Sequence, residues 1–101
     1  MRNRVLVDLL TELHRSIDRV AEDLAPDRPE LARALRKQSA RIPRPEEIAR
    51  GQKPSSARPS GTLAPLLYHA LDEGALDARS FDVLMVQRLR AARLLGAGQS
   101  R

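Results

Sequence analysis

Apolar residues recur every three or four positions along most of the chain, a pattern that predicts helices. We expect the last long helix, from Asp77 to Leu95, to be the element around which the others are organised. Asp77 is a suitable N-cap, and Gly96 and Gly98 are typical of a helix end. The predicted buried face of this helix carries Phe81, Leu84, Met85, Leu89, Ala92 and Leu95.

Three further apolar residues of the same segment, Val83, Val86 and Leu94, lie off that face. A helix at the surface of a domain usually has a single apolar stripe. The segment is therefore either the central rod of a bundle or a helix whose second face contacts another chain. On the second interpretation, these three residues form a protein interface.

The rest of the chain shows the same helical periodicity, and no segment alternates with the period of two that marks a strand. Helices are expected over 4–24 and 29–41, the second capped by Asp27, with one or two helical turns over 45–50. Another helix should begin after Ser60 or Thr62, and Gly74 should turn it into the last helix as a hairpin. With 101 residues, the fold class is one all-α domain, a small bundle of about four helices.

A basic linker separates the two halves of this bundle, from Gln52 to Gly61. It holds two prolines, three serines and the cations Lys53 and Arg58, with no acid and no large apolar side chain. Such a composition is typical of a loop. We expect it to become ordered on an anionic partner; the alternative is a simple mobile connection.

The net charge of +5 is concentrated in the middle of the sequence. From Arg28 to Arg58 there are nine basic and three acidic residues, a sum of +6, against −2 before and +1 after this stretch. Within it, Arg33, Lys37 and Arg41 repeat every four residues. The block favours a polyanion, most simply nucleic acid, although a solvated basic face has the same composition. The predicted phosphate-binding residues are Arg33, Arg36, Lys37, Arg41, Arg44, Lys53, Arg58, Arg79, Arg88 and Arg90.

Nothing in the sequence indicates catalysis. There is no cysteine, His14 and His69 stand apart from any metal-ligand pattern, and the common nucleotide-binding and hydrolase motifs are missing. We therefore expect a protein that is not an enzyme, with no cofactor, no metal and no small-molecule substrate. The basic N-terminus leads into an amphipathic helix rather than a signal peptide, which predicts a cytoplasmic protein with no membrane partner.

Several short motifs match a known family. Ser60-Gly61-Thr62-Leu63, Leu66, Gly74, Arg79-Ser80-Phe81, Leu84-Met85 and Arg88-Leu89, together with Ala34-Leu35-Arg36-Lys37 upstream, resemble the small subunit of Cascade-type (class 1) CRISPR effector complexes. Ser80 stands where that family has a second arginine. Better-known members continue into another helical lobe with tryptophans, and these 101 residues contain no tryptophan, so we expect a minimal type of small subunit rather than a two-lobed one.

The resemblance implies a non-enzymatic helical protein of antiviral defence. Several copies would stack with other subunits along a ribonucleoprotein and line a groove for guide RNA and for target or displaced single-stranded DNA. The aromatic content of the sequence agrees with this implied function. Tyr68 and Phe81 are the only aromatic residues, so stacking on bases is nearly unavailable and contact must be from arginine to phosphate.

Two alternatives remain open. In a helical adaptor or chaperone, the second apolar face of the last helix is the functional surface and the arginines only solvate the protein. In a helix-turn-helix regulator, Ala70 and Gly74 have suitable spacing. However, Ser80 occupies an expected apolar position, and Asp77 and Asp82 would repel DNA.

Overall fold

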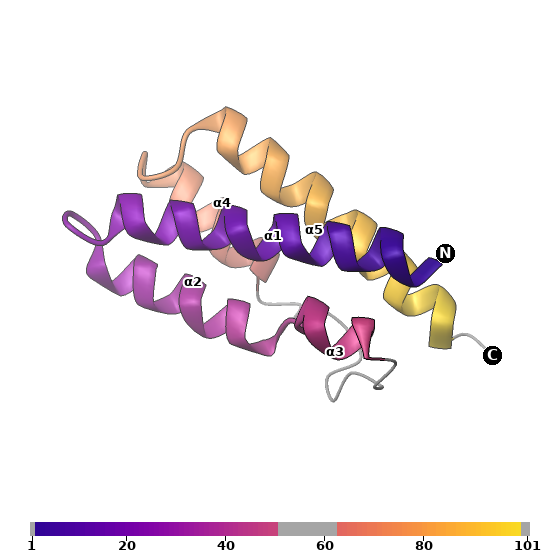
Figure 1. Cartoon of the computed structure of the whole chain (residues 1–101). Helices are drawn as coiled ribbons and strands as arrows, with labels where there is room; N and C mark the ends of the chain where they lie inside the picture. The colour runs from indigo at the N-terminus through magenta and orange to yellow at the C-terminus, as the bar shows by residue number, and fades with distance from the viewer. Residues whose placement is uncertain (1, 51–62, 100–101) are drawn as a thin grey trace.

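The computed structural model of the chain describes residues 2–50 and 63–99, and within these ranges it contains helices and no strand. The helices are α1 (Arg2–Leu24), α2 (Pro29–Arg41), α3 (Pro45–Ala49), α4 (Leu63–Asp72) and α5 (Ala78–Gln99). Figure 1 shows them as a small bundle, with α2 and α5 on either side of α1. The predicted all-α bundle of about four helices is confirmed, with α3 as a short additional turn.

The central element of the bundle is α1, not the last helix. It packs against α2, α3 and α5, while α5 contacts only α1 and α4 among the described helices. Leu10, Leu13, Ile17 and Ala21 of α1 have no exposed surface, because its apolar residues follow one regular stripe. The expectation that the chain is organised around the last helix is wrong.

The turn between α1 and α2 is bonded to the end of α4 through Arg28 and Glu73. Pro29 occupies the first turn of α2, and the N-cap residue is Arg28 rather than the predicted Asp27, with no side-chain capping bond. Arg28 instead donates through Nη1 to Oε1 of Glu73 at 2.8 Å, just beyond the end of α4. This hydrogen bond lowers the pKa of the Glu73 carboxyl.

The predicted hairpin of α4 and α5 is present. Gly74 has φ +73°, a left-handed conformation that favours glycine. The amides of Ala75 and Leu76 both donate to the carbonyl of Ala70, at 3.0 and 3.1 Å. Leu76 is buried and fastens the turn to the core.

Asp77 is the N-cap of α5, as predicted. Its carboxylate accepts hydrogen bonds from the Ser80 amide at 3.2 Å and from the Ser80 hydroxyl at 2.7 Å, and these bonds lower the pKa of Asp77. The expected helix end at Gly96 and Gly98 is wrong, because α5 continues to Gln99. Glycine inside a helix costs only about 1 kcal/mol relative to alanine, so it disfavours the helix without ending it.

The apolar faces of α5 differ from the predicted ones. Leu84 is buried, and Phe81 and Met85 pack against the core, as expected. The predictions for Leu89 and Leu94 are wrong. Leu89, predicted on the buried face, is 47% exposed, whereas Leu94, predicted on a second face, packs against the core. The buried side of α5 is continued by Ala91, two helical turns after Leu84.

Candidate nucleic-acid interface

The outer face of α2 is rich in basic side chains. Leu31, Ala32 and Leu35 are buried against the neighbouring helices, so the residues on the opposite side of α2 face solvent. Apart from Glu30 in the first turn, the helix contains no acid. The side chains on its exposed face include all four predicted cations, Arg33, Arg36, Lys37 and Arg41.

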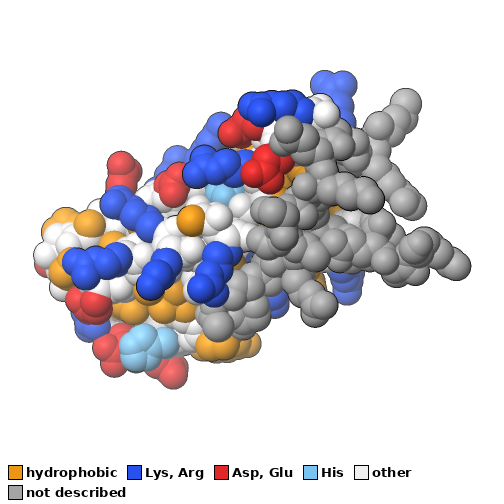
Figure 2. Space-filling view, turned by 90° about the horizontal axis from the view of Figure 1, so that it is seen from below, with side chains coloured by type: hydrophobic (Ala, Val, Ile, Leu, Met, Phe, Trp, Pro, Cys, Tyr) orange, Lys and Arg blue, Asp and Glu red, His pale blue; other side chains and the backbone are white. Residues whose placement is uncertain are grey.

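Within this set, Arg33, Lys37 and Arg41 form what we call the α2 row. A four-residue step along a helix advances about 6 Å and turns only about 40° past a full turn, so these side chains leave the helix in similar directions. Figure 2 views the molecule from the side on which α2 lies in Figure 1 and shows several Lys and Arg side chains in a row across this face. A chain of phosphates could follow such a row.

The partly buried side chain of His14 holds the end of α2 in place. Nε2 of His14 donates to the carbonyl of Pro43 at 3.0 Å, since that carbonyl can only accept, and Nδ1 lies 2.9 Å from the Ser39 hydroxyl. His14 belongs to α1, whereas Ser39 and Pro43 lie near and beyond the end of α2. The imidazole therefore links the two helices. No cluster of metal-binding side chains occurs among the described residues.

Arg36 and Arg44 lie in a different environment from the α2 row. Both line a hollow of about 290 Å³ between α1, α2 and α3, together with Asp18 and Glu46. Two carboxylates beside two guanidinium groups reduce the positive potential there. The hollow therefore has mixed charge, whereas the helix that carries the α2 row has Glu30 as its one acid.

The structure does not bring the arginines of α5 together with those of α2. Among the described helices, α2 and α5 make no contact, and α1 and α4 lie between them. Arg90 is exposed, whereas Arg88 is half-buried with a buried Nε that has no hydrogen-bond partner. The predicted sites Lys53 and Arg58, and the basic linker that contains them, fall outside the described residues.

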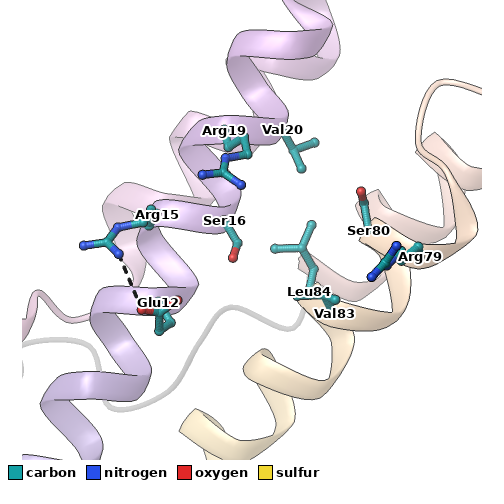
Figure 3. Close-up of a pocket in the computed structure, with 9 residues that line it drawn as sticks. All are labelled: Glu12, Arg15, Ser16, Arg19, Val20, Arg79, Ser80, Val83 and Leu84. Atoms are coloured by element: carbon teal, nitrogen blue, oxygen red, sulfur yellow. Dashed lines mark ion pairs between the residues drawn. The ribbon is translucent and has the colours of Figure 1, made fainter.

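Arg79 lines a groove between α1 and α5 with two arginines that the sequence reasoning did not select, Arg15 and Arg19. The groove has a volume of about 340 Å³. Figure 3 shows Val20 of α1 and Leu84 of α5 facing one another across it. Arg15 and Arg19 are four residues apart and therefore share a helix face, which the sequence alone could have indicated. That α5 lies beside them depends on the tertiary fold.

Two of the three residues of the predicted protein interface are exposed, and the interface itself stays a prediction. Val83 and Val86 are 44% and 47% exposed on α5, so their side chains are accessible to another chain. Leu94 is the exception, because it packs against the core. The two aromatic residues pack against each other at the α4–α5 hairpin, with the rings of Tyr68 and Phe81 4.9 Å apart in an edge-to-face arrangement.

Comparison with known proteins does not place the chain in a family. No family model, no curated protein and no solved structure matches it. The resemblance to Cascade small subunits therefore stays a prediction that rests on the short motifs alone. Among the described helices, none combines the length and the apolar character needed to cross a bilayer.

Proposed function

We propose that this protein is a non-enzymatic helical scaffold that binds the sugar–phosphate backbone of single-stranded nucleic acid on the outer face of α2. The observation that carries the proposal is the α2 row. Three cations lie on one exposed face of a helix whose opposite face is buried, and that helix has no acid after its first turn. Cations in this arrangement repel one another, and a bound polyanion relieves that repulsion.

The position of the aromatic side chains supports contact with phosphates rather than with bases. Single-strand binding through bases needs aromatic platforms next to the backbone groove. Tyr68 and Phe81 pack on each other at the α4–α5 hairpin, and neither belongs to α2. Contacts from the row would be to phosphate, which carries no sequence information. The bound strand could be guide RNA or single-stranded DNA in a complex of the Cascade type.

The binding of labelled homopolymers tests this function. Fluorescence anisotropy would be measured for oligo(dT), oligo(dC) and oligo(U) of equal length at one salt concentration. Backbone recognition predicts affinities for the three that agree within a few-fold, with a common decrease when salt is raised. A regulator of the helix-turn-helix type would instead bind one duplex sequence and leave the single strands unbound. That result, or no binding at low salt, contradicts the proposal.

A further inference from the structure

The outward side of α1 carries a charge pattern that is complementary to itself. Asp8, Glu12, Arg15 and Arg19 are all exposed, and their spacings of four, three and four residues place them along one helix face. This face, which we call the α1 stripe, lies opposite the buried apolar side of the helix. The first two members are acidic and the last two basic, so the stripe reads negative, negative, positive, positive.

We propose that a second copy of this chain docks on the α1 stripe, with the two α1 helices antiparallel about a twofold axis. The axis passes between residues 13 and 14 of α1. Asp8 of each copy then faces Arg19 of the other, and Glu12 faces Arg15, so every charge in the stripe meets its opposite. A parallel arrangement would place acid against acid and base against base, which is unfavourable.

The existing contact within one chain does not compete strongly with this arrangement. Oε1 of Glu12 lies 3.5 Å from Nη1 of Arg15 on the same helix, and the two side chains remain 55% and 65% exposed. Exposed pairs of this kind contribute little to the stability of a monomer. Both side chains can therefore exchange their partner for one in the second copy, where a network of four pairs forms.

The groove beside the stripe gives the second copy an apolar contact as well. Val83 borders this groove on α5, and Val86 follows one helical turn later; each is nearly half exposed. In Figure 1, α5 runs in the opposite direction to α1 and at an angle to it, so a second copy on α1 reaches α5 where the two helices meet. Arg79 lines the same groove from α5, on the opposite side from Arg19 (Figure 3).

A contact of this kind joins two chains and closes, since both copies use the same surface. It is independent of the proposed nucleic-acid binding, because the α2 row is not part of the α1 stripe. A dimer would carry both α2 rows. Stacking of more than two copies would require another surface.

Charge reversal tests the proposal on the full chain. The variant Asp8→Arg with Glu12→Arg makes the stripe wholly positive, and the variant Arg15→Glu with Arg19→Glu makes it wholly negative. The mass in solution would be measured by light scattering coupled to gel filtration. The wild type should have twice the chain mass of 11.2 kDa. Each variant alone should be monomeric, and an equimolar mixture should form a heterodimer in which all four pairs are restored.

A control variant separates the stripe from a general effect of charge. Glu30→Arg with Asp72→Arg reverses two exposed acids outside α1 and α5 and should stay dimeric. A second variant, Val86→Asp, should weaken the dimer while the helix content measured by circular dichroism stays unchanged. The proposal is overturned by a monomeric wild type, by charge-reversed variants that remain dimeric, or by a mixture that fails to associate.

Discussion

The salt dependence of binding gives the most quantitative prediction for the α2 row. Each phosphate contact to a single strand contributes about 0.7 to the slope of log affinity against log salt concentration. If Arg33, Lys37, Arg41 and one further cation outside the row each contact a phosphate, the slope is about −2.8. Raising salt from about 50 to about 200 mM should then weaken wild-type binding about 50-fold.

Replacing Arg33, Lys37 and Arg41 with alanine should remove three of these contacts. The slope should fall to about −0.7, and the same change in salt should weaken binding only about 3-fold. Alanine favours helix, and these side chains are exposed, so the fold should be retained. Affinity would be measured by fluorescence anisotropy at five or six salt concentrations, with circular dichroism as a check on folding.

A matched control distinguishes the row from the net charge of the protein. Arg4, Arg50 and Arg93 are also exposed and lie outside the α2 row, and their replacement by alanine lowers the net charge by the same three units. This variant should keep the wild-type slope to within about one contact, or about 0.7. Equal losses of slope in the two variants would show that binding follows total charge rather than the surface of α2.

The remaining predictions concern the fold that holds this surface in place. Leu13→Ala, at a fully buried position of the central helix, should lower the free energy of unfolding by about 2–5 kcal/mol. Leu89→Ala, at a half-exposed position, should lower the free energy of unfolding by less than about 1.5 kcal/mol. If urea titrations showed equal losses for Leu13→Ala and Leu89→Ala, the central position of α1 would be contradicted. His14→Ala removes two hydrogen bonds and should cost about 1–3 kcal/mol in the same titration. Arg28 lowers the pKa of Glu73, so this pair stabilises the fold at a pH above the ordinary carboxyl pKa of 4.5, and the contribution is lost as pH falls through the lowered value. The free energy of unfolding of Glu73→Gln should therefore differ from that of the wild type above that pH and converge with it below. A difference that stays the same at all pH values would show that the ion pair is not responsible.

Helix positions could be predicted from the sequence because periodicity is a local property. The apolar face of α1 and the cap at Asp77 each depend on residues within a few turns of one another, and both are present in the structure. The buried face of α5 is harder to predict from periodicity. Its apolar residues lie on more than one side, so their spacing allows several faces, and contact with α1 leaves Leu89 exposed and brings Leu94 against the core.

Contacts between distant segments were beyond sequence reasoning. His14 and Pro43 are 29 residues apart, and no local pattern joins them. The same holds for Arg28 and Glu73, so Arg28 was counted with the basic block although its guanidinium is paired. The grouping of Arg79 with Arg19 also depends on α5 lying beside α1.

The measurement that tests nucleic-acid binding on α2 most directly is a titration of the labelled protein with oligo(dT) followed by amide NMR. If the strand binds on α2, the shifts should concentrate in residues 33–41 and saturate together. The first turn of α5, around Arg79, should change little. Shifts centred on the first turn of α5, with α2 unchanged, would instead place the nucleic acid on the α4–α5 hairpin.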